Sequence, residues 1–194
     1  MKRKLSFGLF IVLGIVFMFA ACAKPPTTEV EAAQSALSRA QADADAREYA
    51  PDSITRAENL VNRMQSALDA KEYDSAKSLA LEAKDAAEKA IADGAAAKEK
   101  ARVDASTAIS NAKNLLTEVR NALNGAKSVR GIRLDIPVTE NDTNAAAQTV
   151  TAADADFGNA AYTAAYTKAQ DARSALAGIQ RRIADAVQVA TRRK

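Results

Sequence analysis

The chain has 194 residues, is rich in alanine, and has only 7 Gly, 4 Pro and 5% aromatic residues, a composition that is typical of long helices and excludes a sheet protein. It has no His, which removes the commonest general base, and its single Cys excludes an internal disulfide. The formal charge of +3 becomes zero without Lys2, Arg3 and Lys4, because 24 basic residues then balance 24 acidic ones, and this excludes the net basic charge of a nucleic-acid-binding protein.

The N-terminus has the pattern of a secretory signal. Its basic start is followed by a continuous apolar run over residues 5–19, and then by Ala20, Ala21 and Cys22. The apolar run is shorter than the roughly 20 residues that a membrane-spanning helix needs. The pattern resembles bacterial lipoprotein signals, in which a peptidase cuts before the Cys and the Cys thiol carries a diacylglycerol. A transmembrane anchor and a plain secretory peptide are the alternatives.

The resemblance implies a signal peptide over residues 1–21, followed by an acylated Cys22 and a linker over residues 22–28. Several acyl chains hold a protein on a bilayer more firmly than one. Ala23 stands where enteric bacteria place the Asp that retains lipoproteins in the inner membrane. The resemblance therefore implies a location at the outer membrane, facing the periplasm.

A helical domain is predicted over residues 29–127. Thr28 opens a capping-box signature, which predicts a helix start. Pro51 predicts that this first helix ends just before it, because the residue before a proline disfavours helical geometry. Asp52 or Ser53 would then cap the next helix.

A helical hairpin is predicted over residues 54–90, because apolar residues recur at alternating steps of three and four, the spacing of a narrow coiled-coil seam. The two seams are Ile54, Ala57, Val61, Met64 and Leu68, and Tyr73, Ala76, Ala80, Ala83, Ala87 and Ala90. The short polar connection over residues 69–72 predicts antiparallel neighbours. The second helix either continues to about Ala126 or bends near Gly94, since one glycine costs a helix about 1 kcal/mol and need not break it.

The hairpin pattern recurs further along the chain. At an offset of 109 − 54 = 55 positions, the run from Ile109 to Leu123 matches the first seam. At an offset of 162 − 73 = 89 positions, the run from Tyr162 to Ile179 matches the second seam. We interpret this as a duplication whose second copy contains an insertion of 89 − 55 = 34 residues. The alternative is that any two alanine-rich amphipathic helices look alike.

One stretch carries a family resemblance. Its residues are Ala46-Arg47-Glu48-Tyr49-Ala50-Pro51, then Ala57 and Leu60, then Tyr73, Ala76, Ala80, Ala83 and Ala87. This pattern resembles a domain of unknown function in bacterial envelope lipoproteins, over about residues 29–91. In that family the domain often precedes an OmpA-like peptidoglycan-binding domain, but no such domain follows here. The resemblance implies no catalytic residues.

The insertion over residues 128–153 is expected to be a loop, because Gly131, Pro137 and a polar run after them end the helical pattern. Apolar and polar residues alternate here as in a strand, and the apolar set is Ile132, Leu134, Ile136 and Val138. We favour an extended loop that packs these side chains on the bundle, and the alternative is a segment that binds a partner by strand addition. The oxygen-bearing residues Glu140, Asn141, Asp142 and Asn144 lack EF-hand spacing, so no metal site is expected.

The C-terminal helix is predicted over residues 154–194, packed on the same bundle. Its basic end, Arg192-Arg193-Lys194, suits the negative end of a helix dipole. The alternative is a resemblance to murein lipoproteins, acylated alanine-rich helices whose terminal lysine is joined to peptidoglycan, which would make Lys194 an attachment site. Asp154 and Asp156 are the best available carboxylate pair for an enzyme, but helix capping explains them better.

The sequence thus predicts an all-α protein, an elongated antiparallel bundle of long alanine-rich helices with a duplicated hairpin. We expect a membrane-anchored lipoprotein that acts as a non-enzymatic scaffold or adaptor in the bacterial envelope. The alternative is a lipoprotein that tethers peptidoglycan through its basic C-terminus. Expected partners are the lipid bilayer, through Cys22, and an envelope protein or peptidoglycan, with no cofactor, metal or nucleic acid.

Overall fold

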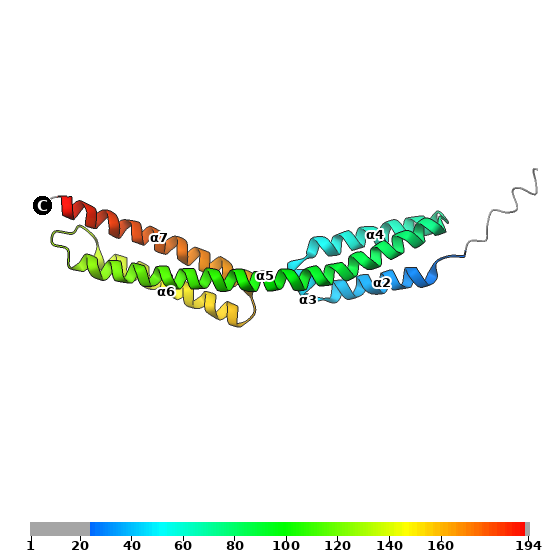
Figure 1. The fold of residues 1–194 in the computed structure, drawn as a ribbon, viewed down its shortest axis with the longest axis horizontal. Coiled ribbons are helices and arrows are strands. Elements are labelled where there is room, and N and C mark those ends of the chain that lie inside the picture. The colour runs from blue at the N-terminus through cyan, green and yellow to red at the C-terminus, as the bar shows by residue number, and fades with distance from the viewer. Residues whose placement is uncertain (1–23, 193–194) are drawn as a thin grey trace, which may run out of the picture. The chain divides into compact units, whose positions relative to one another are not determined.

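The computed structural model describes residues 24–192, and all regular structure in this range is α-helical (Figure 1). The helices are α2 (Thr27–Ala42), α3 (Ala44–Tyr49), α4 (Pro51–Asp69), α5 (Tyr73–Lys127), α6 (Ile136–Gly158) and α7 (Tyr162–Arg192). They pack on one another through shared clusters of buried apolar side chains, so the prediction of an all-α bundle is confirmed. None of the described helices combines the length and the hydropathy that crossing a membrane requires.

The chain divides into two compact units between Gly94 and Ala95, within α5. Here unit 1 denotes the residues up to Gly94, and unit 2 denotes those from Ala95 onward. This differs from the predicted division after residue 127. Because α5 is helical from Tyr73 to Lys127, Gly94 does not break it, and the reading of one continuous helix is correct.

In unit 1, α2, α4 and the first part of α5 lie side by side (Figure 1). Met64, late in α4, shares a buried cluster with Ala80, early in α5. Ile54, early in α4, shares another with Ala87, further along α5. The two helices are therefore antiparallel, as the predicted hairpin requires. Helix α2 runs in the direction of α5, since its early and late residues join the two clusters in the same order.

Two predictions about how helices begin in unit 1 are wrong. Helix α2 has Pro26 at its N-cap without a side-chain cap, so the capping box at Thr28 is not formed. Helix α4 begins at Pro51 itself, with Ala50 as its uncapped N-cap, so neither Asp52 nor Ser53 caps it. For α4 the physical reason is that Pro51 suits the first helical turn, where the fixed φ of proline is already helical and its missing N–H costs nothing.

In unit 2, the rest of α5 packs with α6 and α7 (Figure 1). Ile109 of α5 shares a cluster with Ala165, early in α7, and Val119, further along α5, shares one with Ile179, later in α7. Helices α5 and α7 are therefore parallel. Helix α6 joins the same clusters in the opposite order and is antiparallel to both.

The predicted loop over residues 128–153 is wrong from Ile136 onward, where α6 begins. Asp135 caps this helix by accepting a hydrogen bond from the Val138 N–H at 3.1 Å. The buried stripe has the helical spacing of four, three, four and three residues, and its members are Thr139, Thr143, Ala146, Val150 and Ala153. A pattern search that counts threonine as polar misses this stripe. The two threonine hydroxyls are buried because each donates to a backbone carbonyl of its own helix.

Helix α6 also changes the relative direction of the helices that carry the matched seams. Five matched pairs of the second seam are buried in both copies: Ala76 and Ala165, Ala80 and Ala169, Ala83 and Ala172, Ala87 and Leu176, and Ala90 and Ile179. The copies nevertheless differ in topology, because a helix inserted between two arms reverses the chain direction once more. The matched helices are antiparallel in unit 1 and parallel in unit 2.

The turns after α4 and after α6 have the same geometry. Lys71 and Ala160 both adopt a positive φ, at 60° and 59°. In the first turn the Glu72 N–H donates to the Ala67 carbonyl, and in the second the Ala161 N–H donates to the Asp156 carbonyl, both at 2.9 Å. These are Schellman motifs, which usually have glycine at the left-handed position.

Candidate functional site

Two of the predicted site residues, Cys22 and Lys194, lie outside the described residues. The lipidation site and the peptidoglycan attachment site therefore stay predictions.

The predicted partner-binding segment lies mainly on the core of unit 2. Ile132 and Leu134 are in the non-helical connection between α5 and α6, and Ile136 is the first residue of α6. All three are half-buried against the cluster that contains Val119 and Ile179 of α5 and α7, in line with the favoured packing interpretation. Val138 differs, because 46% of its surface is exposed.

The carboxylates considered for catalysis or metal binding lie on α6 and are paired with cations. Asp154 accepts from Lys113 of α5, with 2.6 Å between Oδ2 and Nζ. Asp156 lies 2.7 Å from Lys168 of α7 through the same atom types. These pairs join α6 to its neighbours, which gives both carboxylates a structural role.

Two acidic residues of the polar run over residues 140–144 form ion pairs. Glu140 pairs with Lys127 at 2.5 Å, and Asp142 pairs with Arg182. Among residues 24–192, no three Cys, Asp or Glu side chains converge in a way that could hold a metal ion.

Unit 1 has an open groove of about 830 Å³ between α4 and α5. It is lined by Leu60 and Ala86 together with polar and charged residues that include Arg56, Glu82 and Lys89. This open, mostly polar lining differs from the enclosed, mainly apolar pockets that bind small substrates.

Asp93, at the edge of this groove, is held in its charged form. Lys89 Nζ lies 2.5 Å from Asp93 Oδ1, and Ser53 Oγ donates to Asp93 Oδ2 at 2.9 Å. The hydrogen bond from Lys89, and then the one from Ser53, lower the pKa of Asp93 from its ordinary value. A carboxyl group with a lowered pKa is a poor proton donor at neutral pH, so the geometry gives Asp93 no role as a general acid.

Unit 2 has a second groove, of about 640 Å³, between α6 and α7. Its walls are mostly small side chains, among them Ala145, Ala175 and Gly178, and the Asp142–Arg182 pair lines it as well. A Cβ added at Gly178 would meet nothing within 4 Å, so the groove is open at this point.

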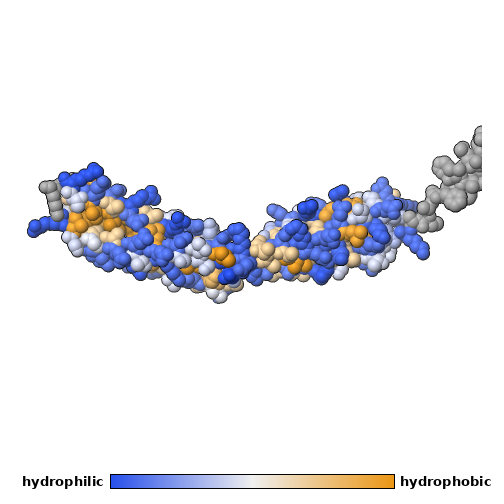
Figure 2. All heavy atoms as spheres, in the orientation of Figure 1, coloured by the Kyte–Doolittle hydropathy of each residue, from blue (hydrophilic) through white to orange (hydrophobic). Residues whose placement is uncertain are grey.

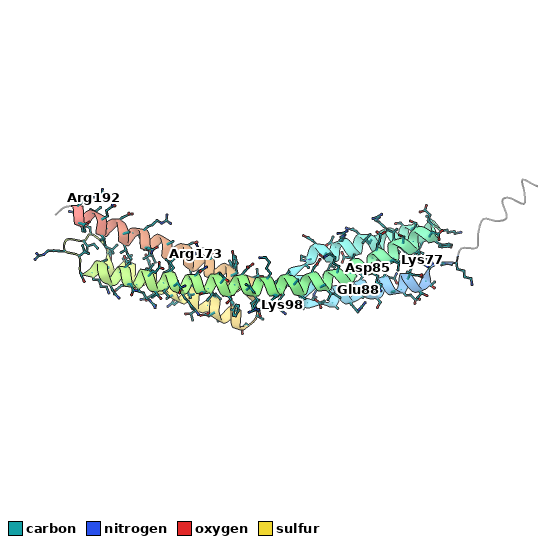
Figure 3. All side chains as sticks on the ribbon, viewed as in Figure 1. Lys77, Asp85, Glu88, Lys98, Arg173 and Arg192 are labelled. Carbon is teal, nitrogen blue, oxygen red and sulfur yellow. The ribbon has the colours of Figure 1, made fainter. Side chains whose placement is uncertain are left out.

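The division of the chain reveals a charge separation that the whole-chain count hides. Residues 22–94 contain nine basic and fourteen acidic residues, a formal charge of −5. Residues 95–194 contain fifteen basic and ten acidic residues, a formal charge of +5. Figure 3 shows members of each set, Asp85 and Glu88 on α5 in unit 1 and Arg173 and Arg192 on α7 in unit 2. The signal was present in the sequence, but only the unit boundary shows where to split the count.

Comparison with known proteins identifies one part of the chain. No curated protein matches the chain. No solved structure matches it either. The model of a family described as a domain of unknown function (DUF4398) matches residues 28–106, which include most of unit 1 and continue into α5. This agrees with the uncharacterised domain predicted over residues 29–91 and extends it by about four helical turns. Residues 28–106 are thus similar to a family whose function is unknown.

Proposed function

We propose that the protein is a lipoprotein, anchored through acylated Cys22, that acts as a non-enzymatic helical adaptor at the bacterial outer membrane and faces the periplasm. The observation that carries this proposal is the order of features at the N-terminus. A basic start, a short apolar run, two alanines and the only Cys of the chain follow one another there. The placement of this Cys has no structural explanation in a chain that cannot form an internal disulfide.

The described helices support the adaptor part of the proposal. Both units bury alanine and aliphatic side chains and turn charged side chains outward, which leaves long polar surfaces for contact (Figure 2). Much of the surface charge is engaged in pairs between helices, such as Lys77–Glu29 at 2.9 Å between α5 and α2 and Lys113–Asp154 between α5 and α6. Such pairs fix the register of a scaffold and supply no reactive group.

The anchor is tested by a Cys22→Ser variant. We expect the unchanged chain to incorporate labelled palmitate and the variant to incorporate none. An Ala21→Gly variant is the matched control, because it keeps a small residue before the intact Cys and should still be labelled. The readout is the label and not the membrane fraction, because a chain that is not cut before residue 22 keeps its apolar run. Absence of label from the unchanged chain, or label on the Cys22→Ser chain, would overturn the lipoprotein proposal.

The second candidate function is a covalent link to peptidoglycan through Lys194. It is favoured by the run of basic residues Arg192, Arg193 and Lys194, which begins at the last residue of α7. Isolated wall sacculi, boiled in detergent, should then retain the unchanged chain and lose a Lys194→Arg variant, which keeps the charge but not the reactive amine. Release of both chains by boiling would rule out the covalent link.

A further inference from the structure

The end of unit 2 that is remote from Ala95 concentrates basic side chains. It consists of residues 127–138, where α5 ends and α6 begins, and residues 181–192, the last turns of α7. Six basic residues, Lys127, Arg130, Arg133, Arg181, Arg182 and Arg192, stand against two acidic ones, Asp135 and Asp185. We call this surface the basic end of unit 2.

Four of these cations are not neutralised within the described chain. Lys127 pairs with Glu140 and Arg182 pairs with Asp142. The exposed residues Arg130, Arg133, Arg181 and Arg192 have no ion-pair partner among residues 24–192. The Asp135 carboxylate is occupied as the N-cap of α6. The positive field of this end is therefore directed at solvent, where it can act on an external anion.

The basic end also exposes aliphatic surface. Val138 and Val189 are 46% and 44% exposed, and Ile132, Leu134 and Val187 are half-buried on the core cluster beneath them. Figure 2 shows apolar atoms gathered where α7 finishes, bordered by hydrophilic ones. Residues 127–138 and 181–192 contain no Trp, Tyr or Phe.

We propose that the basic end of unit 2 binds an anionic lipid surface. Basic side chains gain about 1 kcal/mol each near an anionic bilayer, and exposed aliphatic groups add burial at the headgroup boundary. An acidic protein is the competing partner. The exposed aliphatic side chains beside the cations favour the lipid surface, because a segment that lies on a bilayer buries apolar groups at the headgroup boundary next to its basic ones. The inference names a partner for the proposed adaptor and rests on that function. It implies that the chain contacts a bilayer at a point other than its N-terminal anchor.

The expected weakening of vesicle binding on removal of charge follows from the binding free energy that each basic residue contributes. Neutralising Arg130 and Arg133 removes two of the four unpaired cations, which corresponds to weakening of vesicle binding by about 30-fold. The binding should also weaken in high salt, because the Debye length falls from about 10 Å at 0.1 M to about 3 Å at 1 M.

The test uses the mature chain from residue 22 to residue 194, made without acylation through a Cys22→Ser change, so that the anchor cannot contribute. Co-sedimentation is measured with vesicles of phosphatidylcholine alone and with vesicles that also contain phosphatidylglycerol. The double variant Arg130→Gln with Arg133→Gln is compared with Arg47→Gln with Lys71→Gln. The latter removes two exposed charges from unit 1 and matches the change in net charge. Circular dichroism verifies that all chains remain folded.

We expect binding only to the phosphatidylglycerol vesicles, about 30-fold weakening in the unit 2 variant, and unchanged binding in the unit 1 variant. Equal binding to both vesicle types, or equal weakening in both variants, would overturn the proposal. An absence of vesicle binding would also overturn it and leave an acidic protein as the partner for this end. These outcomes do not depend on acylation. A failure of the lipid-binding proposal is therefore distinguishable from a failure of the anchor, which is detected only by experiments on Cys22.

Discussion

Gly94 permits a close approach of two backbones in unit 1. A Cβ built on Gly94 of α5 would lie 2.5 Å from the Ala46 Cα and from the Ala46 N, and 2.8 Å from the carbonyl carbon of Asp45, all in the segment that starts α3. These are backbone atoms, so they cannot be relieved by a side-chain rotation. Gly94→Ala must therefore push α3 away from α5.

The size of the effect is a difference between two opposing contributions. Replacing glycine by alanine inside a helix is worth about 1 kcal/mol of stability. Overpacking a close contact costs about 1–3 kcal/mol, and a contact with rigid backbone belongs at the upper end. We expect Gly94→Ala to lower the free energy of unfolding by about 2 kcal/mol, against the direction that helix propensity alone predicts.

Gly125 provides a matched control in the same helix, because a Cβ there would meet nothing within 4 Å. Gly125→Ala should raise the free energy of unfolding by about 1 kcal/mol. Urea unfolding followed by far-ultraviolet circular dichroism measures both variants, and hydrogen exchange at residues 44–49 locates the loss in α3. If Gly94→Ala stabilises the protein as Gly125→Ala does, the reasoning about the close contact is refuted.

Three further predictions concern the core, a turn and the acid limit of stability. Leu176 is fully buried in unit 2, so Leu176→Ala should lower the free energy of unfolding by about 2–5 kcal/mol. Hydrogen exchange should then show lost protection in unit 2, and lost protection in unit 1 alone would contradict the division into units. Ala160→Gly should stabilise the protein by about 1 kcal/mol in thermal unfolding, because it relieves an alanine held at a φ of 59°; an unchanged or lower midpoint would contradict that strain. The pKa values of Asp93, Glu29 and Glu99 are lowered by hydrogen bonds from their basic partners. The stability that these carboxylates contribute is therefore complete at a pH above the ordinary carboxyl pKa, and it is lost as the pH falls through their lowered pKa values. Because the chain has no His, urea midpoints should be flat from about pH 5 to 8 and decrease only in acid; a step near pH 6.5 would refute this.

The helix seams could be predicted because alanine and aliphatic spacing alone determines which face is buried. The second seam from Ala76 to Ala90 and its match from Ala165 to Ile179 are buried at each of the five paired positions. Helix α6 could not be found in this way, since two of its five buried positions are threonines whose polarity is satisfied within their own helix. Without α6, the parallel arrangement of α5 and α7 could not be predicted either.

The features that define the candidate sites can be recognised only once the division of the chain into two units is known. The opposite charges of residues 22–94 and 95–194 cancel in any count over residues 22–194. Gly94 is ambiguous as a sequence letter, because both a helix break and a close helix contact call for glycine. The structure resolves this through the position of the Ala46 backbone. The basic end that includes Arg130 and Arg133 can likewise be recognised only once the connection between α5 and α6 is placed beside the last turns of α7.

The claim that the protein is a membrane-anchored lipoprotein is tested most directly by mass spectrometry of the N-terminal peptide of the mature protein, isolated from membranes. The account predicts that this peptide begins at Cys22 and carries a diacylglycerol on the thiol, with further acylation of the new amine. A mature chain that begins elsewhere, or that begins at Cys22 with a free thiol, would contradict it.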